Sequence, residues 1–107
     1  MIDNDLKNEL SNIFSKYKEI KKVVIFGSRA RGDYKKTSDV DICLFGNKVD
    51  HAVLSKVWFD IEEINTYLSF DIINYYELVK KELINNILKD GIEIYNEQIR
   101  REKSRLH

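Results

Sequence analysis

Apolar residues near the start of the chain recur at helical spacing. The set, at steps of three and four, is Leu6, Leu10, Ile13, Phe14 and Tyr17. This spacing predicts an amphipathic helix over residues 3–17, with Asp3 or Asn4 capping its start.

Three later segments have the pattern of strands. Residues 23–26 form an unbroken apolar run rich in β-branched side chains, which predicts a strand buried on both faces and ending at Gly27. From Asp39 polar and apolar residues alternate, so residues 39, 41, 43 and 45 should share one face of a second strand. A third strand is predicted over residues 69–74, with Asp71 and Ile73 on one face. Residues 92–95 could add an edge strand.

Two more segments read as helices, over residues 50–67 and over the stretch from Leu78 to Lys89, where Gly91 is well placed as a C-terminal stop. Residues 27–38 hold two of the four glycines and little apolar bulk, which indicates a loop with room for one helical turn after Ser28. Strands that alternate with helices predict a mixed α/β (α+β) fold, a sheet of three or four strands with helices on one or both faces. We expect one domain over residues 1–96 and a basic C-terminal tail over residues 97–107.

Composition narrows the possible functions. A chain of 107 residues supports one core, so any activity must fit one compact site. The 18 Lys and Arg residues balance 18 Asp and Glu, which gives no global field for coating a nucleic acid or a membrane. A single cysteine excludes an internal disulfide or a multi-cysteine metal site. With no signal-like start and no long apolar run, we expect a cytoplasmic protein with no membrane and no direct nucleic-acid partner.

Three acids occupy unusual positions. Asp39 and Asp41 alternate along a strand whose other face is apolar, so both carboxylates should project from one side. Like charges this close repel, and Mg²⁺ is the simplest counter-charge for paired hard oxygen ligands. Asp71 interrupts another apolar strand. If that strand lies beside the first, three carboxylates could bind two metal ions, an arrangement typical of phosphoryl or nucleotidyl transfer.

The loop before these acids suits an anion. Gly27 ends a strand and Ser28 could start a helical turn, whose backbone N–H groups would face a phosphate. Arg29, Arg31 and the pair Lys35 and Lys36 place positive charge around it. The loop has neither the P-loop spacing nor the Rossmann glycine pattern, so those two nucleotide folds are excluded.

Taken together, these residues resemble a known family. Gly27 and Ser28, ten intervening residues, then Asp39, Val40 and Asp41 match the signature G-S-x10-D-x-D of the DNA polymerase β-like nucleotidyltransferase superfamily. The spelling GSRARG followed by TSDVD looks like its smallest branch, the minimal nucleotidyltransferase (MNT) proteins, in which a third acid on a later strand corresponds to Asp71. The resemblance extends from about residue 23 to residue 95.

The resemblance implies a role for each residue. Gly27 and Ser28 would hold the β- and γ-phosphates of ATP as substrate, and Asp39 and Asp41 would bridge two Mg²⁺ ions. Asp71 would ligate the metal nearer the nucleophile and help to deprotonate an acceptor hydroxyl, which attacks the α-phosphate and expels pyrophosphate. Arg29 and Arg31 would steady the triphosphate or brace the loop, and Ser38 is the remaining nucleotide-binding candidate.

The resemblance also implies a partner. MNT proteins are usually paired with an all-helical HEPN protein, often a ribonuclease toxin, and some transfer AMP to a tyrosine hydroxyl of that toxin. The expected function is therefore a Mg²⁺-dependent adenylyltransferase that acts as the antitoxin of a HEPN toxin.

Other interpretations stay open from the sequence. The protein could be an antitoxin that masks its toxin by stoichiometric binding, or an enzyme that modifies a small molecule such as an aminoglycoside. Asp39 and Asp41 could be exposed strand-edge acids, and the loop arginines could be solvated. Cys43 reads as a small buried hydrophobe, Tyr75 or Tyr76 could stack on a base, and the tail could be a solvated helix or dock on a partner.

Overall fold

The structure, a computed structural model, describes residues 2–105 and contains a four-stranded sheet in the order β3-β2-β1-β4. Its strands are β1 (Lys22–Phe26), β2 (Val40–Phe45), β3 (Phe70–Asn74) and β4 (Ile92–Asn96). β2 and β3 run parallel, and β1 lies antiparallel to both β2 and β4. The predicted mixed fold, with four strands, is therefore confirmed.

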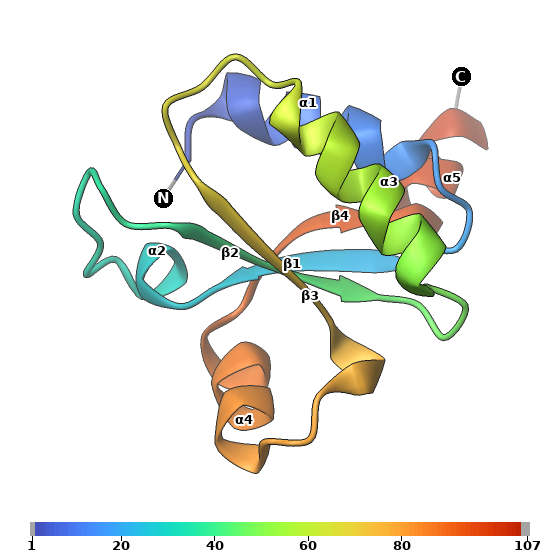
Figure 1. Ribbon diagram of the computed structural model, residues 1–107. Coiled ribbons are helices and arrows are strands. Elements are labelled where there is room, and N and C mark those ends of the chain that lie inside the picture. The colour runs from blue at the N-terminus through green and yellow to red at the C-terminus, as the bar shows by residue number, and fades with distance from the viewer. Residues whose placement is uncertain (1, 106–107) are drawn as a thin grey trace.

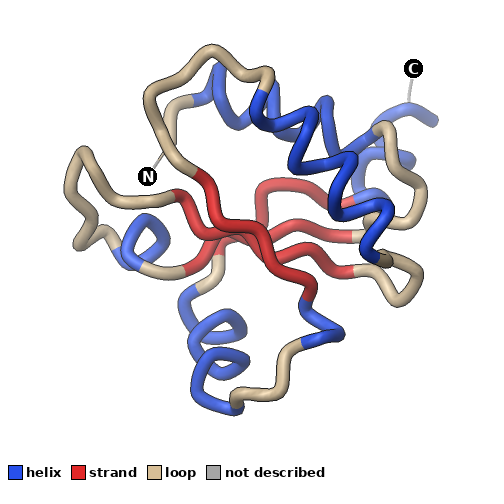
Figure 2. Tube along the Cα trace, viewed as in Figure 1, coloured by secondary structure: helices blue, strands red, loops and turns tan. Residues whose placement is uncertain are grey.

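Helices cover both faces of this sheet (Figure 1). On one face lie α1 (Asn4–Ser15) and α3 (His51–Glu62), and on the other lies α4 (Lys81–Asp90). The shorter elements are α2 (Ser28–Arg31), the 3-10 helix η1 (Tyr75–Glu77) and the C-terminal α5 (Glu97–Arg105). Figure 2 shows the same arrangement, with helices above and below the crossing strands. None of the helices in the described range is long and apolar enough to cross a bilayer.

The central strands are apolar on both faces because each face packs against helices. The α1 and α3 side holds the larger core, which includes Val23, Ile25, Val40, Ile42, Leu44 and Ile72. The α4 side holds a smaller core of Val24, Phe26, Cys43, Phe45 and Ile87. Cys43 is fully buried and burial raises its pKa to about 12, so it behaves as the predicted small hydrophobe.

The first helix begins as the sequence predicts. The Asp3 side chain accepts a hydrogen bond from the Leu6 backbone N–H at 2.8 Å, which satisfies one of the free donors of the first turn. The inward positions Leu6, Leu10, Ile13 and Phe14 are buried against the sheet. This helix covers the face opposite the one from which the acids project.

Two predicted helices have different ends in the structure. The helix expected over residues 50–67 ends at Glu62, and the Thr66 hydroxyl accepts a local hydrogen bond from the Leu68 N–H that belongs to a turn. Ile64 and Leu68 still pack on the core, so their apolar spacing continues where the helix does not. The helix expected from Leu78 begins at Lys81, because η1 follows β3 directly and is capped by the Asn74 side chain.

Gly91 ends α4 as predicted, but for a different reason. Its φ of −62° is open to any residue, so the left-handed cap that usually favours glycine is absent. A Cβ at this position would overlap both the Ile87 carbonyl oxygen and the Val24 side chain. Gly91 therefore lets α4 approach β1 closely.

The tail is a helix anchored at its first residue. The Glu97 carboxylate lies 3.0 Å from Lys21 Nζ and 2.8 Å from an Arg101 guanidinium nitrogen, and the Glu97 N–H donates to the Lys21 carbonyl at 2.9 Å. These contacts lower the pKa of Glu97, chiefly through its hydrogen bond with Lys21. The last two residues of the predicted tail, 106 and 107, lie outside the described range.

Candidate functional site

The three acids lie at the same end of the sheet. In the parallel pairing of β2 and β3, Asp41 and Asp71 are direct register partners, and Asp41 also faces Phe26 of β1. Asp39 lies one residue before β2 begins. Cys43 and Ile73, which pack on the α4 side, lie two residues after Asp41 and Asp71 in their strands. Residues two apart in a strand share a face, so both carboxylates project from the α4 side of the sheet. The neighbouring strands required by the sequence prediction are therefore present.

The turn after β1 lies against this group. Gly27 has φ 75° and ψ −154°, a backbone conformation that is essentially confined to glycine. A Cβ on Gly27 would overlap the Asp41 carboxylate and stand 3.3 Å from its carbon Cγ. The Gly27 and Ser28 turn and the acidic strand, twelve or more residues apart in sequence, thus meet because Gly27 lacks a side chain.

The structure places one helical turn after Gly27, as the sequence suggested. The N–H groups of Ala30 and Arg31 both donate to the Gly27 carbonyl at 3.1 Å, and α2 then ends at Gly32, whose φ is 88°. Ser28 is the first residue of α2 and directly follows Gly27. Figure 1 shows α2 beside the end of β1 and the loop that leads into β2.

The acids interact electrostatically. Burial raises the pKa of the Asp41 carboxyl above its ordinary value, and the negative charges of Asp71 and Asp39 raise it further. The Arg31 guanidinium acts in the opposite direction but does not cancel these effects. A nearby cation would therefore stabilise the ionised Asp41 carboxylate, and Arg31 provides only part of this stabilisation.

This raised pKa predicts that Asp41→Asn stabilises the metal-free protein at neutral pH. A group whose pKa is raised by folding contributes stability below its ordinary pKa of 3.8, and this is lost as the pH rises through the folded-state value. As the pH rises from below 3.8 to neutrality, the free energy of unfolding of wild type should therefore decrease relative to that of the variant.

Urea unfolding at a series of pH values in EDTA measures this difference. Glu62→Gln, which removes one exposed charge at the end of α3, serves as the control and should show no such trend. Parallel stability curves for wild type and Asp41→Asn would contradict the electrostatic account of the acids.

The acids fit a divalent cation by chemistry but do not form a closed metal site. Within residues 2–105, no group of three or more His, Cys, Asp or Glu side chains is arranged to hold a metal ion. Asp39 and Asp71 are exposed and their charges repel Asp41, which favours separated carboxylates. Hard oxygen donors on one face, with one raised pKa, still suit Mg²⁺. The metal role of Asp39, Asp41 and Asp71 stays a prediction.

The predicted nucleotide-binding arginines differ in their surroundings. Arg29 is only 6% exposed, and its guanidinium donates to backbone carbonyls of the loop before β2. Of the two roles expected for it, loop bracing is the one seen. Arg31 is exposed, and its Nε lies 3.3 Å from the Asp33 carboxylate. Ser38 Oγ accepts from the Lys35 N–H at 2.9 Å, so this side chain also holds the loop.

A small pocket of about 290 Å³ lies between the segments that lead into β2 and β3, and none of the three acids lines it. One wall is the loop at Lys36, Thr37 and Ser38, and the other is Tyr67, Leu68 and Ser69 just before β3. The Ser69 carbonyl accepts from the Val40 N–H at 2.9 Å, which joins the two segments. The sequence predicted a helix through Tyr67, whereas in the structure this residue lies in the loop before β3 and is exposed.

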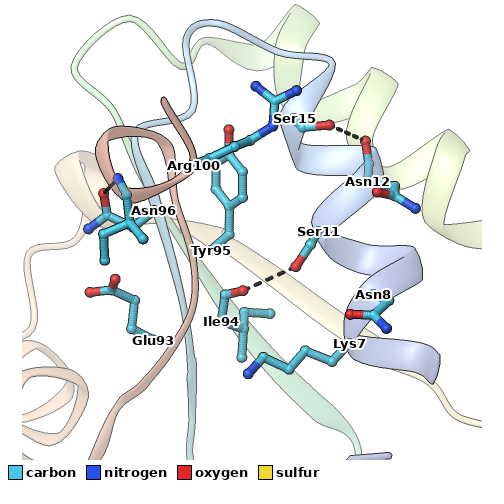
Figure 3. A pocket seen from close by; sticks show the side chains of 11 residues that line it. Lys7, Asn8, Ser11, Asn12, Ser15, Glu93, Ile94, Tyr95, Asn96 and Arg100 are labelled. Atoms are coloured by element: carbon cyan, nitrogen blue, oxygen red, sulfur yellow. Dashed lines mark hydrogen bonds between the residues drawn. The ribbon is translucent and has the colours of Figure 1, made fainter. Parts of the chain in front are cut away.

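A larger groove lies away from the acids (Figure 3). It has a volume of about 560 Å³ and runs between the polar side of α1, the edge strand β4 and the start of α5. Ser11 donates across it to the Ile94 carbonyl at 3.1 Å. None of the predicted site residues lines it, so this groove and the predicted catalytic residues lie in different places.

Tyr75 and Tyr76, which the sequence suggested for base stacking, have different surroundings. The Tyr75 ring is partly buried and stacks on Phe45 of the α4-side core, with centroids 4.4 Å apart. Tyr76 is exposed and meets Tyr75 edge-on. Tyr75 is therefore held by packing against this core, and both tyrosines follow β3 at the end opposite Asp71.

Comparison with known proteins gives the family. The family model described as "Polymerase beta, Nucleotidyltransferase" matches residues 8–100. Two proteins of Methanocaldococcus jannaschii, each named "Putative protein adenylyltransferase", are similar in sequence. One is 46% identical over 43 residues, 39% of this chain and 43% of its own length. The other is 31% identical over 86 residues, which cover 77% of this chain and 90% of the relative.

Solved structures show the same fold. One is described as a toxin-antitoxin with AMP-PNP, and it superposes with a TM-score of 0.69 at 15% identity over 90% of this chain and 77% of that one. Another is a tri-AMPylated Shewanella oneidensis HEPN toxin in complex with MNT antitoxin, with a TM-score of 0.66 at 12% identity, covering 94% and 78%. At these identities the likeness concerns the fold alone.

The family match extends over most of the chain and includes the Gly27 turn and all three acids. The predicted enzyme class and the predicted superfamily agree with it. The chain therefore belongs to the polymerase β nucleotidyltransferase family.

Proposed function

We propose that this protein is a Mg²⁺-dependent protein adenylyltransferase, which transfers AMP from ATP to a hydroxyl, a tyrosine in the first instance, of a HEPN-type toxin and thereby acts as its antitoxin. The observation that carries the proposal is the contact of the Gly27 turn with Asp41, which itself lies in register with Asp71. The adenylyl group is supported by the names of the sequence relatives. The partner is supported by the toxin complexes of the structural neighbours.

Each residue has a proposed task. The turn at Gly27 and Ser28 would bind the β- and γ-phosphates through backbone N–H groups and the Ser28 hydroxyl. Asp39 and Asp41 would hold the magnesium ions. When bound, these ions would neutralise charge on the reacting phosphate and lower the pKa of the attacking hydroxyl. Asp71, exposed at the start of β3, would accept the proton of the acceptor hydroxyl.

The reaction balances as a single displacement. The acceptor oxygen forms a bond to the α-phosphorus of ATP, and the bond from that phosphorus to the bridging oxygen of the β-phosphate breaks. Pyrophosphate leaves with that oxygen, and the hydroxyl proton passes to the Asp71 carboxylate. The acceptor must reach the open end of the sheet on the α4 side, where Asp41 and Asp71 project.

The test uses the protein with its co-expressed HEPN partner, Mg²⁺ and ATP labelled at the α-phosphate. Wild type is expected to make label protein-bound and to neutralise the partner at less than one molecule per toxin, because a catalyst turns over. Asp71→Asn should label little partner and should neutralise it only at stoichiometric amounts.

If wild type transfers no label and Asp71→Asn neutralises the partner as well as wild type does, the antitoxin acts by binding and the proposal fails. If label appears with GTP, CTP or UTP and not with ATP, the transferase proposal stands and the adenylyl assignment is wrong.

A further inference from the structure

The buried Arg29 is the clearest feature near the site that phosphate binding does not explain. It is the first of the four basic residues that the sequence places around the predicted phosphate loop, yet it is only 6% exposed. A side chain this covered has little surface left for a triphosphate. The exposed Arg31, two residues on, is the one that lies in solvent beside the acids.

Arg29 points into the loop that leads to the acids. One terminal nitrogen donates to the carbonyl oxygens of Ser38 at 3.1 Å, Lys36 at 3.3 Å and Lys35 at 3.4 Å. The Tyr34 ring covers the guanidinium, with 4.5 Å from the guanidinium carbon to the ring centroid. Arg29 thus contacts the loop over residues 34–38, which Figure 2 shows projecting from the sheet between α2 and β2.

This loop ends at Asp39. Ser38, whose carbonyl takes the shortest of the three hydrogen bonds, is the residue immediately before it. The same loop is closed by the Lys35 N–H to Ser38 Oγ bond and the Ser38 N–H to Lys35 carbonyl bond of 3.0 Å. Asp39 lies between this loop and the first residue of β2, so the loop holds the chain on one side of it.

We propose that Arg29 is a positioning residue: it ties α2, and with it the Gly27 turn, to the loop that sets the place of Asp39, and it does not bind the nucleotide. The inference rests on the proposed function, because it assigns Asp39 a place in that site. One short, rigid unit would then hold the phosphate turn and the first acid in a fixed relation. Lys would not replace Arg29, because an ammonium is a compact point charge without a planar fork.

The test separates positioning from phosphate binding with two measurements that need no turnover. The first is amide hydrogen exchange over residues 34–39 in the nucleotide-free protein. The second is ATP affinity in EDTA, where a phosphate-binding arginine contributes and a metal ligand does not. For Arg29→Lys we expect exchange to rise about tenfold or more, the effect of losing one hydrogen bond to a charged group. ATP affinity in EDTA should stay within about twofold of wild type.

Ser38→Ala is the second variant, because it loosens the same loop without changing charge and leaves the buried arginine in place. It should raise exchange over the same residues and likewise leave ATP affinity in EDTA unchanged. Lys36→Ala is the matched control for exchange, since it removes a charge but keeps the carbonyl that Arg29 contacts. With partner present, both Arg29→Lys and Ser38→Ala should lower kcat and leave KM for ATP near wild type, by up to about 10²-fold for Arg29→Lys.

A loss of ATP affinity in EDTA of tenfold or more for Arg29→Lys, or unchanged exchange over residues 34–39, overturns the proposal. These two results are independent of catalysis. If wild type transfers no AMP, the proposed function fails while exchange and metal-free affinity still decide the role of Arg29.

Discussion

Asp41→Asn is expected to lower AMP transfer to the partner by about 10³-fold, the upper range for removing one group that stabilises developing charge. Asp41 contacts or interacts with every other part of the site. It is in register with Asp71, and the Gly27 turn lies against its carboxylate. Burial and the charges of Asp71 and Asp39 raise its pKa. An amide keeps the shape but offers only one oxygen and no charge to a cation. Initial rates of label transfer, with folding checked by circular dichroism, measure the loss.

Asp33→Asn is the matched control. Asp33 lies in the loop after α2, is exposed and pairs with Arg31, so its loss removes one negative charge near the site without touching the three-acid group. It should keep most of the activity. If Asp41→Asn transfers AMP at a rate close to that of Asp33→Asn, Asp41 has no part in the chemistry.

The same Asp41 substitution should make the metal-free protein more stable while it removes activity. Burial and two like charges disfavour the ionised Asp41 carboxylate, and the fold tolerates this cost at the place where a cation would offset it. A stability cost confined to functional groups is common where selection acts on activity. An Asp41→Asn protein that is both inactive and less stable would instead indicate a structural role for this acid.

Gly27→Ala is expected to have the second-largest effect, a fall in transfer of about 10²-fold, because a displacement of about 1 Å at a reacting centre has a cost of this size. Two causes combine. The backbone of Gly27 occupies a region that other residues essentially never adopt, which costs about 1–3 kcal/mol. The added Cβ would also overlap the Asp41 carboxylate and drive it from its place.

Gly32→Ala separates these two causes. Gly32 also has a positive φ, of 88°, but an added Cβ would meet nothing within 4 Å. Its alanine variant should lose stability from backbone strain and keep most of its activity. Thermal unfolding and transfer rates of both variants measure the difference. Equal losses of activity would mean that strain in the loop, and not the approach to Asp41, explains the glycine.

Much of the fold could be predicted because the hydrophobic pattern of the strands matches the way they are buried in the structure. The alternation at residues 39–45 and the apolar run at 23–26 predict central strands, and these strands are covered on both faces. The predicted end of the second long helix was wrong because the apolar residues keep helical spacing after the helix has ended. Ile64 and Leu68 lie beyond Glu62 and still pack on the core. Gly91 shows a further limit, because the closeness of α4 to β1 has no local signature.

The sequence predicted the arrangement of two acids but not the details around them. The alternation in the second strand and the acid in the third predicted that Asp41 and Asp71 would share one face, and the strand register confirms this. The functional roles of Gly27, Ser28 and the three acids stay predictions. Sequence cannot show that Arg29 turns inward while Arg31 stays in solvent, because both follow Ser28 in the same short helix. It also cannot show how far apart repelling carboxylates stand, since this depends on side-chain conformation and on bound cations.

The central claim, that the three-acid group transfers AMP to a partner protein, is tested most directly by the intact mass of the purified HEPN partner. The partner is incubated with ATP, Mg²⁺ and either wild type or Asp41→Asn. With wild type, we predict a mass increase equal to one or more AMP groups, with one pyrophosphate released for each. An unchanged partner mass after neutralisation by wild type, or the same increase with Asp41→Asn, would contradict it.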